Sequence, residues 1–223
     1  MRMSIQIMPI EGTDYMKNSM KVLLILLISL IIILISITVY NKVKIQNVFD
    51  EIYYDSRNAS GDGFEKRSSL GNIKGMSSSP MDLTSINASE GERIIIESYQ
   101  DKFLPSPMKS LIISNNSTKN QLEISYSLSV TENVNIFFEN KYDVKTKALT
   151  KRISFIELDS GKRITTKKEV QKSVAKYNIT DEQLKQWYNL GMNKIFLKDW
   201  FSVYPSKYSI GHLGNVKIQE FGD

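Results

Sequence analysis

The stretch LEISYSLSVT, residues 122–131, alternates apolar and polar side chains over ten consecutive positions. Its apolar members fall on every second residue, and serine, glutamate or threonine stands between them. Successive side chains of a β-strand point to opposite faces of the sheet, so this period of two places all the apolar groups on one face. The stretch therefore predicts a strand with one buried face and one polar face.

Segments on both sides of this stretch extend the pattern. Residues 133–142 and residues 149–158 show the same alternation, and a short polar connection separates them. Two shorter apolar runs, residues 92–99 and residues 109–114, are candidate strands that precede it. Alternating strands joined by short connections are typical of an antiparallel sheet that is solvated on one side. We therefore predict an antiparallel β-meander.

Helical patterns follow the predicted strands. Residues 166–177 open with Thr-x-x-Glu, and a longer stretch, residues 180–203, opens with Thr-x-x-Gln; both fit a capping box. The longer stretch carries an apolar stripe that ends before Pro205. A final alternation over residues 215–221 predicts a last strand at an edge of the sheet. The fold class is accordingly α+β, with helices packed on one face of the meander.

An apolar segment near the N-terminus precedes this domain. Its nineteen residues, from Val22 to Tyr40, contain no charged side chain. As a helix the segment would be about 28 Å long, close to the thickness of the hydrocarbon core of a bilayer. A cleaved signal peptide normally has a shorter apolar region that ends in small residues, and no such ending is present here. We therefore predict one uncleaved transmembrane helix.

The chain is expected to divide at this helix. Residues 1–21 would form a short cytoplasmic tail, residues 22–40 the anchor, and residues 41–91 a juxtamembrane helix with a Ser/Gly-rich segment. Residues 92–223 would form the extracellular α+β domain, with residues 41–223 folding as one unit.

The membrane orientation of the predicted anchor is inferred from the lengths of the segments on its two sides. Basic residues are equally frequent on its two sides, so the positive-inside rule does not decide the orientation. A short tail before a long domain favours a single-pass protein of the cell membrane with its C-terminal domain outside. Residues from Met16 onward form a short basic segment directly before the apolar run, as the start of a signal-anchor usually does. We therefore expect Met16 or Met20 to be the native start.

Composition excludes several classes of function. The chain has no cysteine and one histidine, His212, so thiolate metal sites, cysteine nucleophiles and multi-histidine metal sites are excluded. A net charge of +5 is too small to indicate nucleic-acid binding. No phosphate-binding loop, HExxH or G-x-S-x-G motif is present. We expect a protein that is not an enzyme and has no catalytic residue, cofactor or metal; a hydrolase without a known motif is the alternative.

The polar side of the meander is the candidate binding surface. We call it the polar face, and it would bring together six residues of two neighbouring strands: Glu123, Ser125, Ser127, Asn135, Phe137 and Glu139. Phe137 lies out of phase with the apolar residues around it, and an aromatic group within a polar rim is typical of a protein interface. The alternative is an ordinary solvated face of a sheet.

The order of segments resembles the TipC family of immunity proteins. The resemblance rests on the apolar span and on three phrases that follow it: NVFDEIYYDS at residues 47–56, YDVKTKALTK at residues 142–151 and MNKIFLKDWFSVYPSKYS at residues 192–209. It implies a membrane-anchored immunity protein outside the cells of a Gram-positive bacterium, acting in interbacterial competition. The partner that it implies is TelC, a toxin of the type VII secretion pathway that degrades lipid II.

Composition agrees with such a source, and one other function stays open. Isoleucine occurs 28 times and alanine four times, a bias that suggests an AT-rich genome such as that of a low-GC Gram-positive bacterium. The leading expectation is therefore an immunity protein that binds and inhibits a secreted antibacterial toxin, with no nucleic-acid partner. The alternative is an envelope sensor or assembly factor that binds wall or membrane components.

Overall fold

The computed structural model describes residues 12–57, 69–73, 76–80, 91–99, 104–116 and 119–219. The chain divides into two compact units, Met1–Ile45 and Gln46–Asp223, and each is described by itself. Much of the Ser/Gly-rich segment expected within residues 41–91 lies outside the described residues.

The first unit contains a single described helix, α1 (Gly12–Lys44). Its residues Met20–Ile37 have a mean hydropathy of 3.0 and are not buried against the protein. This is the one helix in the described ranges that is long and apolar enough to cross a membrane, and a signal sequence has the same properties. The hydroxyl of Ser29 donates to the carbonyl of Ile25 at 2.8 Å, so this polar group is satisfied within the helix.

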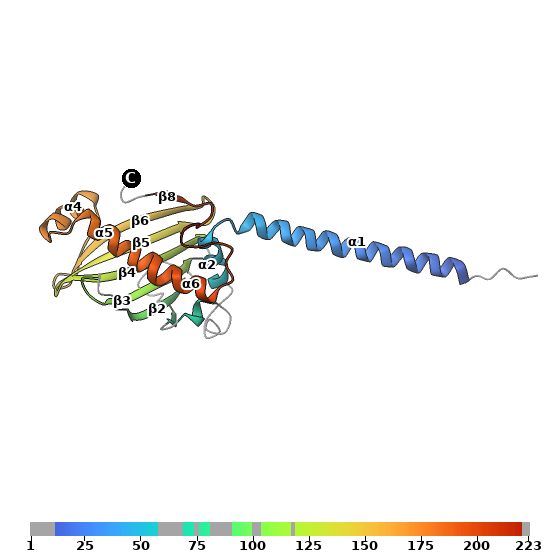
Figure 1. The fold of residues 1–223 in the computed structure, drawn as a ribbon, viewed down its shortest axis with the longest axis horizontal. Helices are drawn as coiled ribbons and strands as arrows, with labels where there is room; N and C mark the ends of the chain where they lie inside the picture. Colours follow the sequence, from blue (N-terminus) through green and yellow to red (C-terminus); the bar gives the residue numbers. More distant parts are fainter. Residues whose placement is uncertain are drawn as a thin grey trace, which may run out of the picture. The chain divides into compact units, whose positions relative to one another are not determined.

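The second unit is built on an eight-stranded sheet whose first seven strands follow one another in chain order (Figure 1). Each of these seven is antiparallel to the next, as the alternating pattern predicts. The strands are β1 (Met76–Pro80), β2 (Gly91–Tyr99), β3 (Met108–Asn116), β4 (Gln121–Thr131), β5 (Val134–Asp143), β6 (Ala148–Glu157) and β7 (Lys162–Ile164).

Two short strands share the free edge of β6. β7 pairs with its C-terminal residues, from Phe155 to Glu157. β8 (Lys217–Gln219) pairs in parallel with its first residues, from Ala148 to Thr150. The predicted last strand is therefore confirmed, although it covers three residues and is parallel to its neighbour.

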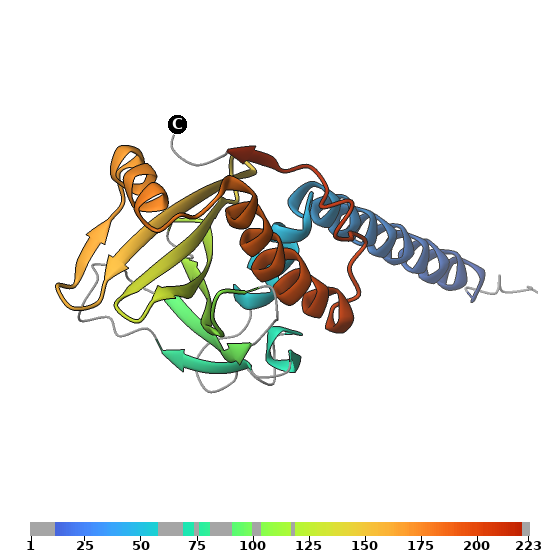
Figure 2. The same ribbon diagram turned by 60° about the vertical axis from the view of Figure 1, so that its left-hand side comes forward.

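The described helices of the second unit contact one face of the sheet (Figure 2). They are α2 (Val48–Arg57), the 3₁₀ turn η2 (Ser69–Asn72), α4 (Lys167–Lys176), α5 (Asp181–Tyr188), the π-helix η3 (Asn189–Leu197) and α6 (Lys198–Val203). The rings of Phe49 and Tyr142 join α2 to β5, and the rings of Phe155 and Tyr177 join β6 to the end of α4. The α+β fold class is confirmed.

The core lies between this face and the helices. The buried residues of β4 include Leu122, Ile124, Tyr126 and Leu128, which are apolar members of the alternating stretch 122–131. The ring of Tyr126 stacks on that of Phe138 with centroids 5.0 Å apart. Its hydroxyl donates to the carbonyl of Tyr188, at the junction of α5 and η3.

The π-helix brings its backbone very close to Tyr126. A Cβ on Gly191 would lie 2.4 Å from two carbon atoms of the Tyr126 ring, so no side chain fits there. Bonds of the i→i+5 type place residues five apart on the same side of a π-helix. Leu190 with Ile195, and Gly191 with Phe196, are accordingly buried together.

We expect Gly191→Ala to destabilise the second unit. The added methyl group must displace the Tyr126 ring or the helix backbone, and overpacking of this kind costs about 1–3 kcal/mol. Gly211→Ala is the matched control, because a Cβ at Gly211 would meet nothing within 4 Å. Thermal unfolding of the full chain in detergent measures the difference, and equal melting temperatures for the two variants would contradict the close contact.

Candidate functional site

The six residues predicted for the polar face lie together on two adjacent strands. Glu123, Ser125 and Ser127 belong to β4, and Asn135, Phe137 and Glu139 belong to β5. In the antiparallel register, Ser125 pairs with Glu139 and Ser127 pairs with Phe137. All six alternate with core residues, so they lie on the side of the sheet opposite to the one that the helices contact.

Phe137 is less exposed than its sequence context suggests. It is partly buried, and its direct cross-strand neighbours are two small residues, Ser127 on β4 and Ser154 on β6. Those serines are 7% and 1% exposed, respectively. Cross-strand neighbours on one face of a sheet contact one another, so the large ring of Phe137 occupies the space above these two small side chains. The polar face therefore has a partly apolar centre.

The acidic residues of this face are paired within the domain. Glu123 forms an ion pair with Lys141 at 3.6 Å, between groups that are both more than a third exposed. Glu139 contacts the guanidinium of Arg163 on β7. An exposed pair such as Glu123–Lys141 contributes little to stability, about 0–1 kcal/mol, whereas the Glu139 side chain in the second pair is only 12% exposed. Together the two pairs place both signs of charge around Phe137.

Two buried polar atoms of the same face have no hydrogen-bond partner among the described residues. They are the Oγ of Ser154 and the Oδ1 of Asn135. Ser154 pairs with Phe137 across the strands, and Asn135 lies two residues before Phe137 on β5. Buried polar groups in folded proteins are usually satisfied, so these two atoms are exceptions beneath the surface of the polar face.

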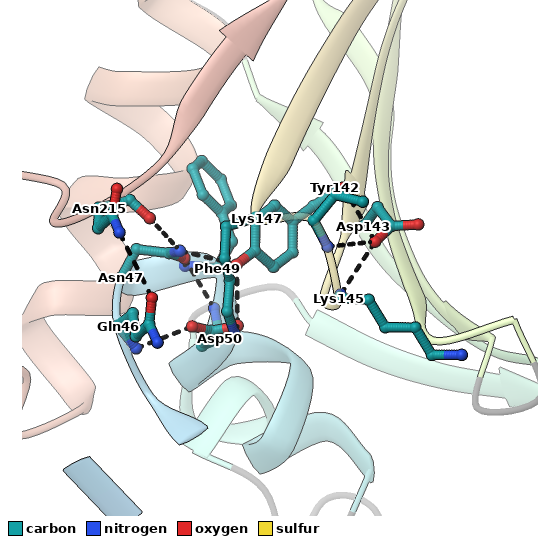
Figure 3. A network of polar contacts seen from close by, with 10 residues as sticks. Gln46, Asn47, Phe49, Asp50, Tyr142, Asp143, Lys145, Lys147 and Asn215 are labelled. Carbon is teal, nitrogen blue, oxygen red and sulfur yellow. Dashed lines mark hydrogen bonds and ion pairs between the residues drawn. The ribbon is translucent and has the colours of Figure 1, made fainter. Parts of the chain in front are cut away.

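A second polar cluster, the junction network, lies where the second unit begins (Figure 3). Asn47 caps α2, because its side-chain oxygen accepts bonds from the backbone N–H groups of Phe49 and Asp50 at 2.9 and 3.0 Å. Its amide nitrogen donates to the hydroxyl of Tyr142 at 2.7 Å and to the carbonyl of Asn215 at 2.8 Å. One buried side chain thus links α2, β5 and the C-terminal segment.

Asp50 is the charged member of the junction network (Figure 3). Its side chain is fully buried and accepts from the ammonium of Lys147 at 2.7 Å and from the hydroxyl of Tyr142 at 2.8 Å. Its second oxygen accepts from the backbone N–H of Gln46 at 2.8 Å. A buried carboxylate with a cation and two further donors is a satisfied structural group.

The C-terminal segment closes the junction network by backbone bonds. The N–H of Val48 donates to the carbonyl of Leu213 at 3.0 Å, and the N–H of Asn215 donates to the carbonyl of Gln46 at 2.9 Å. Between them, Gly214 has a φ of +89°, and a Cβ there would lie 2.5 Å from the Gln46 carbonyl. The segment after α6 is therefore fixed against the start of α2.

Sequence reasoning missed the junction network. Asn47 precedes a helical stripe, which is a local signal for a cap, but its partners Tyr142 and Asn215 are 95 and 168 residues away. Every atom that this network engages belongs to the protein itself, and its geometry is that of a structural joint. The polar face remains the candidate site for a partner.

Glu51 beside the junction network makes the stability of the domain depend on pH. It is 4% exposed, and burial raises its pKa above the ordinary value of 4.5, although a bond from Ser206 at 2.5 Å and the charge of Lys207 oppose this. At pH values between the pKa of the unfolded chain and the raised pKa of the folded domain, the folded state therefore holds a proton that the unfolded chain has released. Its contribution to stability is present below the unfolded pKa and is lost as pH rises through the raised pKa.

We expect Glu51→Gln to flatten this dependence, because the amide keeps an acceptor for Ser206 and does not ionise. The melting temperature of the variant should fall less than that of the parent as pH rises above the ordinary pKa of a glutamate toward neutrality. Glu182→Gln, at an exposed position of α5, is the control. Parallel curves for parent and Glu51→Gln would rule out this origin of the pH dependence.

Neither region contains a described cluster of side chains that could hold a metal ion. Within the described part of the chain, no three or more histidine, aspartate or glutamate side chains are grouped so that they could hold a metal ion. His212 is exposed and contacts the ring of Tyr208, with centroids 6.3 Å apart. The arrangement suits binding of a partner by a face of a sheet.

The fold packs helices on one side of a meander (Figure 2) and leaves the polar face on the other, and comparison with known families gives the class of protein. The sequence model of the TipC immunity protein-like family matches residues 20–220. The chain therefore belongs to this family, and membership supports an immunity protein. That class of protein suggests binding of a cognate toxin and a role without catalysis.

A solved structure shows the same fold. TipC2 from Streptococcus intermedius B196 superposes with a TM-score of 0.66 and 24% sequence identity, over 79% of this chain and 96% of that one. No curated protein sequence matches the chain.

Proposed function

We propose that this protein is a membrane-anchored immunity protein whose extracellular domain binds and inhibits a cognate secreted antibacterial toxin. The observation that carries the proposal is the family match, which spans residues 20–220 and thus both the apolar helix and the sheet domain. Tethering the domain to the membrane would raise its effective concentration where an attacking toxin arrives.

The toxin would dock on the polar face. Two features of that face support this assignment: the partly apolar centre at Phe137 and the mixed charges around it. Protein interfaces combine such an aromatic centre with a polar rim. The resemblance stated from sequence further suggests a TelC-like toxin of the type VII pathway that degrades lipid II.

Neutralisation tests the function directly. Sensitive streptococcal cells with and without the full-length chain are challenged with the secreted toxins of its own strain, and survival is counted. The tagged full-length protein, purified in detergent, is also used to capture partners from the same secretions at high salt. Survival together with capture of one toxin supports the proposal. Capture of wall fragments in place of a protein would favour an envelope sensor.

The identity of the toxin needs a separate measurement. A captured toxin is assayed for lipid II degradation while the full-length protein is added in increasing amounts. We expect the activity to disappear near equimolar addition. A toxin without activity on lipid II would overturn the TelC-like assignment and leave the immunity function intact.

Topology can be tested because the chain contains no cysteine. A single cysteine is introduced at Ser160, an exposed position between β6 and β7, or at Lys21, which directly precedes the apolar segment whichever methionine is the native start. Intact cells are then treated with a maleimide that does not cross membranes. Labelling of Ser160→Cys but not of Lys21→Cys supports an extracellular domain, and the reverse result would contradict it.

A further inference from the structure

The segment between α6 and β8 carries an exposed apolar tip. Ser209 and His212 exchange two backbone bonds, of 3.0 and 2.9 Å, which leaves Ile210 and Gly211 at the end of a tight turn. The side chain of Ile210 is 43% exposed, and the space around Gly211 is open. We call residues 207–212 the tip turn.

The tip turn has the composition of a membrane interface. The ammonium of Lys207 lies 5.1 Å from the ring centroid of Tyr208, and that ring in turn contacts His212. From Trp200 to Gln219 the chain contains lysine but no aspartate or glutamate. Of the three acidic residues of neighbouring α2, Asp50 and Glu51 are buried and hydrogen-bonded to the protein, and the partly buried Asp55 accepts from Ser69. Aromatic, aliphatic and basic side chains together favour the headgroup region of an anionic bilayer.

Chain connectivity limits how far the tip turn can lie from the predicted anchor. The carbonyl of Leu213, next to the turn, is bonded to the N–H of Val48, and Gln46 is bonded to Asn215. Gln46 follows Tyr40 by six residues, and six residues span at most about 20 Å when fully extended. Whatever the arrangement of the two units, the start of the domain stays within that distance of the end of the span.

We propose that the tip turn inserts Ile210 into the headgroup region of the membrane that holds the anchor, with Lys207 and Lys217 attracted to anionic lipid. This inference rests on the proposed membrane anchoring and adds a second attachment point. Two attachments to the membrane, the permanent one through the inserted anchor and a reversible one at the tip turn, would restrict how the domain tilts and hence the direction in which it presents the polar face.

Fluorescence quenching tests the insertion. Ile210→Cys is introduced into the full-length chain, labelled with an environment-sensitive dye and reconstituted into phosphatidylcholine vesicles with or without phosphatidylglycerol. Some of the lipid carries a nitroxide at the headgroup. Leu158→Cys is the matched control, because Leu158 is an apolar residue of similar exposure, 46%. It directly follows the C-terminal end of β6, whereas β8 pairs with the N-terminal end of that strand.

An interfacial side chain lies roughly 5–10 Å into the headgroup and acyl boundary, so we expect the nitroxide to quench about half or more of the emission at position 210 and little at position 158. Stronger quenching with phosphatidylglycerol would support the role of the lysines. Equal quenching at the two positions, or none at position 210, would overturn the insertion. Flotation of the same samples keeps the two proposals apart: a protein that does not float with vesicles contradicts the anchor, whereas one that floats without quenching contradicts only the tip turn.

Discussion

Replacing Lys147 by methionine is expected to lower the free energy of unfolding of the domain by about 3 kcal/mol. The substitution removes the only cation shown within hydrogen-bonding distance of Asp50 among the described residues, and the Asp50 side chain is fully buried. Leaving a buried charge without its partner is far more costly than losing an exposed ion pair, about 3–5 kcal/mol. For a chain of this size the change corresponds to a melting temperature lower by roughly 6–12 °C.

Lys145→Met is the matched control, since Lys145 lies in the same turn and is exposed. It should leave the melting temperature nearly unchanged. Adding Asp50→Asn to Lys147→Met should restore part of the loss, because the amide still accepts from Tyr142 and carries no charge. If Lys147→Met has the same melting temperature as the Lys145→Met control, the junction network does not stabilise the domain in this way.

Replacing Phe137 by alanine is expected to weaken binding of the cognate toxin about 30-fold, or roughly 2 kcal/mol. The reason is that Phe137 supplies the apolar centre of the polar face, and aromatic residues at such centres carry a disproportionate share of binding energy. Glu139→Lys should weaken binding as well, because it replaces the partner of Arg163 by a second cation. Titration of the captured toxin with each full-length variant measures both effects.

Phe201→Ala controls for the loss of an aromatic ring. Phe201 is also partly buried, but it belongs to α6 and packs against the core. This variant should melt at a lower temperature and keep its affinity for the toxin. Unchanged affinity in both Phe137→Ala and Glu139→Lys would remove the polar face as the binding surface, even if the protein still neutralises the toxin.

The long strands could be predicted from sequence because one face of the sheet is buried and the other is polar. β4 and β5 show that difference as a period of two and β6 shows it less regularly, and the predicted boundaries of all three strands agree to within a residue or two. β1 and β7 were missed, because MSSSP has almost no apolar residue to alternate and KRI is too short for a period.

The helices show which features short-range sequence patterns predict and which they do not. Thr180 forms the predicted capping box with Gln183. Thr166 caps α4 without a side-chain bond to the backbone, because its hydroxyl is bonded to the side chain of Glu169. The π-helix could not be predicted from a period of 3.6, since its buried residues repeat at intervals of five and its position depends on Tyr126, far away in sequence.

For the candidate site, alternation alone predicted which six residues share a face, and the register places them side by side. Their binding role remains a prediction. The sequence did not show that Arg163 would neutralise Glu139, or that serines on both sides would partly bury Phe137, because those contacts depend on strand pairing. The junction network depends in the same way on pairs of residues from opposite ends of the domain.

The closure of that junction also sets the order in which the domain can fold. A meander can assemble strand by strand as the chain emerges, since each strand pairs with the one before it. Asn47 and Gln46, however, wait for residues 213–215, which are synthesised almost last. A nascent chain with a complete seven-strand meander would still hold Asn47 without its C-terminal partner. A stop codon placed shortly before Leu213 should therefore lower the melting temperature of the domain even though the seven-strand meander is complete.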